Sequence, residues 1–267
     1  MITSMGNSQV KELSALMKKA RERRKQNAFV VEGIRIAREV PQEELIKLYL
    51  SESLSKLRKS DDMDEQTRQW MCTIPEEKIE VLSDAVFKNV SDTVTPQGAL
   101  AVAKCRNPKI EEWELPKKGC ILVLENIQDP GNLGTILRTA EGAGVAGILM
   151  SRDTVDIYSP KVVRSTMGSI FRMPFFVSEQ LEEDIQTLKG KGVRMYAAHL
   201  KGKDNYYDCS FDELVGFMIG NEGNGLTDKT AALADEYLRI PMEGQVESLN
   251  AAMAAGILMY EAKRQRR

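Results

Sequence analysis

Apolar and polar residues alternate along the chain in patterns that predict short elements in its first third. A helix is predicted over 8–26, because apolar residues recur there every three or four positions and so share one face. That face is formed by Val10, Leu13, Met17 and Ala20. Short apolar runs predict strands at 29–32, 45–50 and 99–105, and helical segments are predicted at 62–71 and 83–89. Together they predict a small α/β unit over residues 1–105.

The pattern changes after residue 119. The run 121–124 is continuously apolar, as is typical of a strand buried on both faces of a sheet. Similar runs lie at 147–150, 193–197, 215–219 and 237–240, and predicted helices alternate with them at 133–142, 160–167, 179–189, 226–235 and 248–264. Alternating strands and helices predict a parallel sheet with helices on both faces, here an α/β domain over 120–267.

Residues 106–119 separate these two patterns. They contain two prolines, many charges and little apolar periodicity, so we predict a linker.

Composition indicates an ordinary soluble globular protein of one or two domains. The chain has 267 residues, of which 42% are hydrophobic, and a net charge of −2. No apolar run approaches the roughly 18 residues of a membrane span, and the N-terminus lacks the apolar core of a signal peptide. We therefore expect a cytoplasmic protein with no membrane partner.

Charge is distributed unevenly within this near-neutral total. Residues 1–40 carry a net charge of +5 and residues 41–80 a net charge of −4. Basic blocks lie at 18–25 and at 263–267, and such blocks can hold phosphates. The alternatives are a solvated helix face and a frayed tail, so charge alone leaves nucleic-acid binding open.

Cysteine and histidine usage excludes several kinds of chemistry. The four cysteines are far apart and form no metal-binding spacing, so we expect neither a zinc site nor a disulfide framework. His199 is the one histidine, which argues against Ser-His or Cys-His catalysis and against a multi-histidine metal site. We expect His199 to have a structural or solvent-facing role.

Three loops carry the candidate chemistry, and each follows a predicted buried strand and precedes a helix. Ligands of open α/β sheets bind at such strand ends. In the first loop, 129–132 is a turn by composition, Asn126 lies at the strand end, and Arg138 lies in the helix that follows. A helical side chain points back toward the helix N-terminus, so we expect Arg138 to face the loop. The alternative is an ordinary turn with a surface arginine.

The second and third loops place polar groups beside glycine or a helix start. In the second, Glu222 lies among Gly220, Gly223 and Gly225, and backbone amides there could bind a carboxylate or hydroxyls. In the third, Ser248 is a good N-cap, Asn250 lies in the first helical turn, and small residues at 251–256 allow close packing. A plain loop and a plain core helix are the alternatives.

Two nucleotide-binding motifs are excluded. Residues 142–147 fit the GxGxxG spacing, but a dinucleotide site needs a strand before the motif and a helix after it. Here the predicted order is reversed, which argues against a dehydrogenase. The phosphate-binding pattern GxxxxGK[ST] does not occur.

The three loops resemble, in order, the motifs of the SpoU family of RNA 2′-O-ribose methyltransferases, of the trefoil-knotted SPOUT class. The first motif is matched by Asn126, 129–134 and 138–140, the second by 220–225, and the third by 240–242, Gly244 and 248–250. Arg164, Ser165 and Gly168 are similar to the family's middle segment. Residues 29–33 and 91–102 resemble, more loosely, the attached RNA-binding domain with a fold like that of ribosomal protein L30.

The resemblance implies S-adenosyl-L-methionine as cofactor, a homodimer, and a C-terminal segment threaded through a loop to form a knot. It implies that cofactor contacts come mainly from the second and third loops, here Gly220, Ile240 and Leu249, with Met242 and Ala198 as further candidates. It implies that Arg138 is catalytic. We expect Asn126 and Glu222 to orient the substrate or the loop, and Ser248 and Asn250 to fix the site.

The predicted reaction is methyl transfer to a ribose 2′-hydroxyl of structured RNA, with no metal and no DNA partner. Ribosomal RNA of the 23S type is favoured over tRNA because of the L30-like domain. A non-catalytic RNA-binding protein of the same fold is the alternative from another class, although Arg138, Glu222 and Asn250 are all present.

Overall fold

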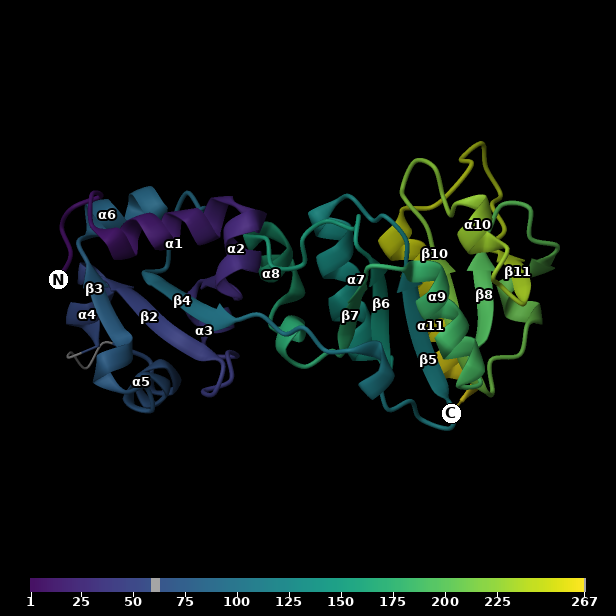
Figure 1. The fold of residues 1–267 in the computed structure, drawn as a ribbon, viewed down its shortest axis with the longest axis horizontal. Coiled ribbons are helices and arrows are strands. Elements are labelled where there is room, and N and C mark those ends of the chain that lie inside the picture. Colours follow the sequence, from purple (N-terminus) through teal and green to yellow (C-terminus); the bar gives the residue numbers. More distant parts are fainter. Residues whose placement is uncertain (59–62, 267) are drawn as a thin grey trace. The chain divides into compact units, whose positions relative to one another are not determined.

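The computed structural model describes residues 1–58 and 63–266 (Figure 1). The chain divides into two compact units. The first unit contains Met1–Arg106 and Tyr158–Phe171, and the second contains Asn107–Ile157 and the residues from Arg172 onward. This division differs from the predicted one at two places.

The first difference is that Tyr158–Phe171, predicted as part of the C-terminal domain, belongs to the first unit. Aromatic packing explains this placement. The ring centroid of Phe29 lies 4.6 Å from that of Tyr158 and 6.1 Å from that of Phe171. The Tyr158 hydroxyl also donates to the carbonyl of Arg106 at 2.7 Å. The segment thus completes a core that residues 1–105 do not close alone.

The second difference concerns the predicted linker, which packs into the second unit. Ile110 and Trp113 are buried in the core of that unit, and Trp113 stacks on Phe176 with a centroid separation of 4.4 Å. The Lys191 ammonium bonds the carbonyls of Ile110 and Trp113 at 3.2 Å each. Two apolar anchors therefore hold a stretch whose prolines and charges indicate a loop.

The first unit is built on a four-stranded sheet of order β1-β4-β2-β3. β4 pairs antiparallel with β1 and β2, and β3 pairs parallel with β2. The strands are β1 (Ala28–Glu32), β2 (Leu45–Ser51), β3 (Ile79–Leu82) and β4 (Ala99–Lys104). The α-helices are α1 (Ser8–Lys18), α2 (Ala20–Gln26), α3 (Ile34–Ala37), α4 (Glu52–Leu57), α5 (Glu65–Cys72), α6 (Asp84–Val90) and α8 (Pro160–Thr166), with short 3₁₀ turns at Glu76–Lys78 and Ser169–Phe171. Asp62, at the start of one predicted helix, lies outside the described residues.

The single helix predicted over 8–26 is two helices, α1 and α2, because Lys19 between them is extended. The break leaves carbonyls at the end of α1 without amide partners. The buried Arg23 guanidinium of α2 takes the place of the missing amides, because it donates to the carbonyl of Leu16 at 2.6 Å and to that of Met17 at 3.2 Å. Arg23 therefore has a structural task.

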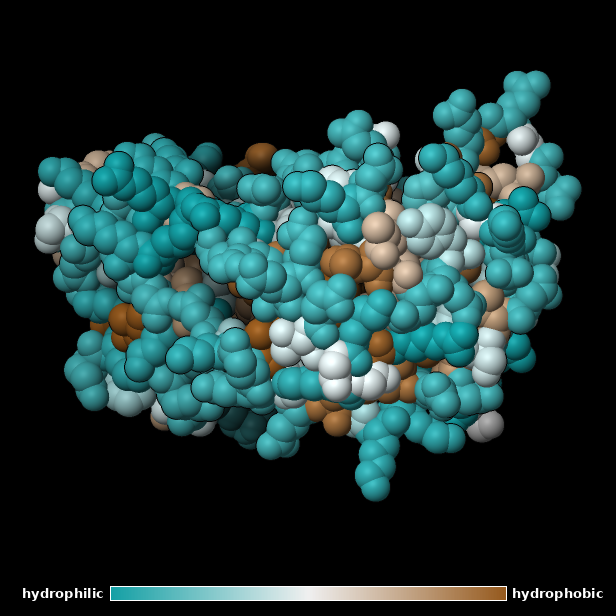
Figure 2. Space-filling view, turned by 45° about the vertical axis from the view of Figure 1, so that its right-hand side comes forward, coloured by the Kyte–Doolittle hydropathy of each residue, from teal (hydrophilic) through white to brown (hydrophobic). Residues whose placement is uncertain are grey.

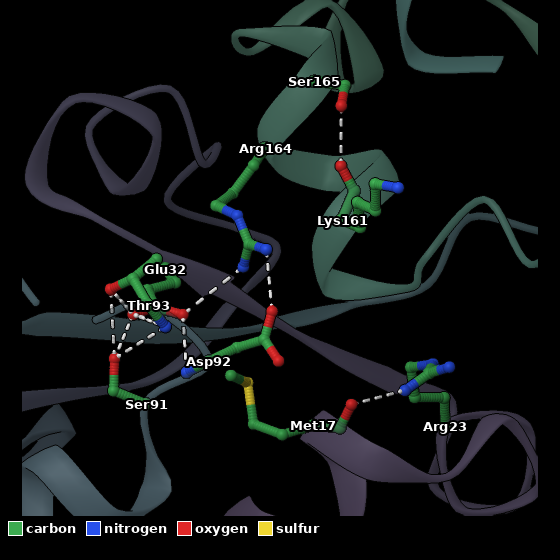
Figure 3. A network of polar contacts seen from close by, with 9 residues as sticks. All are labelled: Met17, Arg23, Glu32, Ser91, Asp92, Thr93, Lys161, Arg164 and Ser165. Carbon is green, nitrogen blue, oxygen red and sulfur yellow. Dashed lines mark hydrogen bonds and ion pairs between the residues drawn. The ribbon is translucent and has the colours of Figure 1, made fainter. Parts of the chain in front are cut away.

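A polar network ties α8 to the N-terminal sequence within this unit (Figure 3). Glu32, at the end of β1, is buried, and its carboxylate accepts hydrogen bonds from the hydroxyls of Ser91 and Thr93 and from the amides of Asp92 and Thr93. The Arg164 guanidinium lies 3.5 Å from Glu32 and 2.7 Å from Asp92. Buried carboxylates require such partners, so the segment that carries Arg164 is held by charge as well as by aromatic packing.

The second unit contains, among the described residues, a seven-stranded sheet of order β7-β6-β5-β10-β8-β11-β9 in which all pairs are parallel. The strands are β5 (Gly119–Leu124), β6 (Gly147–Ser151), β7 (Phe175–Ser178), β8 (Arg194–Ala198), β9 (Asp204–Asn205), β10 (Leu214–Ile219) and β11 (Glu236–Arg239). The helices are α7 (Pro130–Ala143), α9 (Leu181–Gly190), α10 (Asp228–Ala231) and α11 (Ala251–Gln265), with 3₁₀ turns at Ile110–Glu112 and Tyr206–Asp208.

Helices cover both faces of this sheet, as predicted. α9 and α10 pack together on one face, and α7 and α11 pack together, with α11 against β5 and β10, on the other (Figure 1). Residues of β5 alternate accordingly: Ile121 and Val123 join the core under α9, while Leu122 and Leu124 are buried without belonging to it. The predicted α/β class is confirmed, and the knot stays a prediction.

Element ends depart from prediction at the site loops. The helix predicted over 226–235 is reduced to α10, which Thr227 N-caps. The last helix begins at Ala251, because the Asn250 side chain accepts from the amides of Ala252 and Met253; the prediction that Ser248 is its N-cap is wrong.

The face seen in Figure 2 is mainly hydrophilic, with apolar residues in small groups. None of the helices formed by residues 1–58 and 63–266 combines the length and apolar character that crossing a membrane requires.

Candidate active site

The loops after β8, β10 and β11 meet at the carboxyl edge of the parallel sheet and enclose a cavity of about 440 Å³. Strands that run in parallel end at the same edge, which brings these distant segments together. The cavity is lined by all five residues predicted to contact a cofactor: Ala198, Gly220, Ile240, Met242 and Leu249. Glu222 and Ser248 also line it.

The loop 220–227 between β10 and α10 forms one wall of the cavity. It closes on itself through two backbone hydrogen bonds. The backbone amide of Asn221 donates to the Gly225 carbonyl at 3.0 Å, and the backbone amide of Gly225 donates to the Asn221 carbonyl at 2.9 Å. This closure presses the chain against Gly220: a Cβ there would lie 2.1 Å from the backbone of Gly225 and of Leu226. Only glycine fits this position without moving the loop.

The Glu222 carboxylate joins this loop to the first-motif loop. It accepts hydrogen bonds from the amides of Gln128 and Asp129, both at 3.1 Å, and from the Asn132 side chain at 2.9 Å. Partial desolvation acts to raise the pKa of Glu222, but the hydrogen bonds from Asn132 and the two amides outweigh it and lower the pKa below its usual value. Glu222 is therefore ionised at neutral pH and accepts from the first-motif loop.

A side-chain relay continues from Glu222 to the start of α11. The side-chain oxygen Oδ1 of Asn132 accepts a hydrogen bond from the side-chain nitrogen Nδ2 of Asn250 at 2.8 Å. The side-chain oxygen of Asn250 caps α11. One relay thus connects all three motif loops. Ser248 lines the cavity but does not belong to this relay.

Asn126 fixes the other end of the first loop. Its backbone is left-handed, with φ of 54°, a conformation that asparagine tolerates better than most residues. Its amide donates to Ser151 Oγ at 2.8 Å, and its carbonyl accepts from Asn221 Nδ2 at 2.8 Å. The Asn126 side chain accepts from Gln128 Nε2 at 2.5 Å.

Arg138 is exposed on α7 and is absent from the cavity lining. Asp129 N-caps this helix and Pro130 occupies its first turn, so the helix starts earlier than predicted and Arg138 lies about 12 Å along its axis. Within residues 1–58 and 63–266, its guanidinium has neither an ion-pair nor a hydrogen-bond partner. It is therefore available to a ligand that approaches α7 from outside.

Sequence reasoning missed three linking residues: Asn132, Asn221 and Gln128. Asn132 and Asn221 lie inside the segments that match the family motifs, but the sequence does not show which residues their side chains bond. His199, for which we expect a structural or solvent-facing role, also lines the cavity. Its Nδ1 accepts from the Lys201 amide at 3.0 Å and its ring stacks on Tyr237, which is a structural arrangement.

The site offers backbone groups and side-chain amides together with charged side chains: the cavity lining includes the carboxylates of Glu222, Asp228 and Glu247 and the cations of Lys201 and Arg239. No group of three or more histidine, cysteine or acidic side chains suited to a metal ion occurs in the part of the chain that the structure describes.

The fold and the cavity define an α/β protein with a cavity of small-ligand size at the carboxyl edge of a parallel sheet. Residues 119–260 match the model of the SpoU rRNA Methylase family, and residues 7–101 match the MRM3-like substrate binding domain. The chain belongs to the SpoU rRNA Methylase family, so the predicted resemblance is confirmed and the chain is a member of a methyltransferase family.

Relatives match along nearly the whole chain. A 23S rRNA (guanosine(2553)-2′-O)-methyltransferase of Bacillus subtilis, RlmP, is 33% identical over 263 residues, covering 98% of each chain. The AdoMet-bound rRNA methyltransferase from Sinorhizobium meliloti superposes with a TM-score of 0.83 at 29% identity, covering 98% of this chain and 97% of the other. A solved RNA 2′-O ribose methyltransferase gives a TM-score of 0.81 at 30% identity, covering 99% and 98%.

Proposed function

We propose that this chain transfers a methyl group from S-adenosylmethionine to a ribose 2′-hydroxyl of ribosomal RNA. The observation that carries the proposal is the cavity at the carboxyl edge of the sheet, lined by the second- and third-motif loops and tied to the first through Glu222 and Asn132. The Bacillus subtilis relative, named for 2′-O methylation of 23S rRNA, favours rRNA over tRNA.

The cavity fits the proposed cofactor in size and character. Its volume of about 440 Å³ lies within the range of small-molecule sites, which is about 300–1,000 Å³. Leu226, Leu238 and Ile240 offer apolar contacts suited to a base, while the backbone of 198–201 and 220–226 lies at the same wall and can supply polar contacts.

When bound, S-adenosylmethionine supplies the electrophilic methyl group. The residues of this chain must bring the 2′-hydroxyl to it and favour the alkoxide. Arginine side chains are protonated in proteins, and the exposed guanidinium of Arg138 can hold the neighbouring phosphate together with the hydroxyl, so that the hydroxyl proton passes more readily to that phosphate or to water. Glu222 already accepts three hydrogen bonds from the first-motif loop. Its role in this proposal is to hold that loop against the loop 220–227.

The first unit, including α8, is proposed as the RNA-binding part. The match of residues 7–101 to a substrate binding domain supports this role, as do exposed basic side chains at Lys18, Arg21, Arg24 and Lys25, which can contact phosphates. Arg23 is excluded from that surface because its guanidinium bonds α1. The likeness to the L30 fold and a cytoplasmic location stay predictions.

The protein is proposed to act as a homodimer through α11. Met253 and Tyr260, seven residues apart on this helix, are 60% and 50% exposed, and Gly256 lies between them, where a Cβ would meet Thr139 of α7 at 3.7 Å. Spacing of three, four and seven residues places them on one stripe. A second copy that packs there would cover this apolar stripe.

We expect light scattering at micromolar concentration to give the mass of a dimer, and Met253→Asp to give that of a monomer. Asp is favourable in the first turn of a helix, so this change leaves α11 intact. Val94→Asp is the matched control, since Val94 is 91% exposed in the first unit. A monomeric wild type, or a dimeric Met253→Asp variant, would contradict the proposed interface.

Calorimetry with S-adenosylhomocysteine, the demethylated product, tests the cofactor site. We expect one site per chain with micromolar affinity in the wild-type protein. Absence of binding at millimolar ligand would overturn the proposed function.

A further inference from the structure

Glu125 is a buried carboxylate that the proposed reaction does not use. It directly follows β5, and 8% of its surface is exposed. Its amide donates to the Ile219 carbonyl at 2.9 Å, which extends the pairing between β5 and β10 by one step. Within the described parts of the chain, no cation pairs with its carboxylate, so hydrogen bonds alone must offset its desolvation.

In the described part of the chain, the hydrogen bonds of that carboxylate go to Thr227, at the end of the loop 220–227, and to Thr230, in the first turn of α10. Oε2 accepts from the Thr227 amide at 2.8 Å, and Oε1 accepts from the hydroxyls of Thr227 and Thr230 at 2.9 and 2.6 Å. Thr230 is fully buried, and Thr227 caps α10. Hydrogen bonds to an ionised acceptor in a buried place are among the strongest in proteins.

The loop is therefore clamped at both ends by one strand end. Asn221, near its start, donates to the Asn126 carbonyl, and Thr227, at its end, donates to Glu125. Glu125 and Asn126 are adjacent, so the loop between the two clamps is held as an arch. Its inner residues 221–226 line the proposed cofactor cavity, and a displacement at Thr227 would move that wall.

We propose that Glu125 is a positioning residue for the cofactor: its buried carboxylate fixes the loop 220–227 through Thr227 and Thr230 in the shape that binds S-adenosylmethionine. This inference rests on the proposed function, because it takes the cavity to be the cofactor site. Glu125 acts on binding through the loop and touches neither the RNA nor the transferred methyl group.

The test measures S-adenosylhomocysteine affinity by calorimetry and, separately, KM for the cofactor and kcat with saturating RNA. Glu125→Gln replaces an acceptor by a donor that faces other donors, so we expect cofactor affinity to weaken about tenfold or more, with KM rising in parallel and kcat nearly unchanged. Glu182→Gln is the matched control. Glu182 is an exposed glutamate, and together with Glu125 it lines a second cavity of about 340 Å³ that is separate from the proposed cofactor cavity. It should bind as the wild type does.

A second pair of variants guards against misfolding of Glu125→Gln. Thr230→Val keeps the volume but removes the hydroxyl that donates to Glu125, and Thr230→Ser keeps the hydroxyl. We expect Thr230→Val to weaken cofactor binding severalfold. We expect Thr230→Ser to keep most of the wild-type affinity. If wild-type protein binds and the Glu125 and Thr230 variants bind equally well, or if kcat alone falls, the positioning role is wrong while the proposed function stands. If wild-type protein does not bind, both are overturned.

Discussion

Replacing Arg138 by alanine is expected to abolish methyl transfer and to leave cofactor affinity nearly unchanged. The two effects separate because Arg138 is exposed on α7, whereas the proposed cofactor contacts come from the loops after β8, β10 and β11. Losing a group that stabilises a developing oxyanion costs about 10²–10³-fold in rate, and the proposed function assigns this role to Arg138. Single-turnover methylation with saturating RNA measures the chemical step.

Two variants control this experiment. Arg138→Lys should restore activity only in part, because an ammonium cannot reproduce the two-pronged grip of a guanidinium on phosphate. Arg152→Ala removes another exposed arginine of the same unit, one that pairs with Glu179, and should keep most of the activity. If Arg138→Ala retains a near wild-type single-turnover rate, the catalytic assignment is wrong, and Asn126 or Glu222 becomes the next candidate.

Gly220→Ala is expected to have the opposite signature, a loss of cofactor binding. The Cβ of the new alanine would lie 2.1 Å from the backbone of Gly225 and Leu226. Atoms that are not bonded do not come this close, so the loop 220–227 must open. Overpacking of this kind costs about 1–3 kcal/mol, which corresponds to roughly a 5- to 150-fold weaker affinity if the open loop does not bind. Calorimetry with S-adenosylhomocysteine measures the change.

Gly223→Ala is the matched control in the same loop. The nearest atom to its Cβ would be Asn221 Oδ1 at 3.6 Å, an ordinary contact, and its amide would still donate to that oxygen. We expect cofactor affinity close to that of the wild type. Equal binding by Gly220→Ala and Gly223→Ala would show that the closed loop is not part of the cofactor site.

The second sheet could be predicted from sequence because its central strands are buried on both faces. β5 and β10 therefore read as continuous apolar runs, and both were placed within two residues. β7 and β9 lie at the two edges of the sheet, and the sequence pattern predicts neither: β7 is apolar but only four residues long, and β9 is two polar residues. The placement of Tyr158–Phe171 depends on rings distant in sequence, such as Phe29, and no local pattern reports such contacts.

The site was predictable as a set of loops but not as a network. Motif spacing located Glu222 and Asn250, yet their link through Asn132 depends on distances across about 90 and 120 residues of chain. The start of α7 was placed three residues late, because the capping by Asp129 and the fixed φ of Pro130 were read as a turn. As a result Arg138 lies farther from the first loop than expected.

Incorporation of labelled methyl groups tests whether the chain methylates a ribose hydroxyl of ribosomal RNA. Wild-type protein would be incubated with methyl-labelled S-adenosylmethionine and 23S rRNA that lacks modifications, and the RNA would then be digested to nucleosides. We expect the label to be recovered in one kind of 2′-O-methylated nucleoside, and Arg138→Ala to give none. Label on a base, or no transfer by wild-type protein to 23S rRNA, would contradict it.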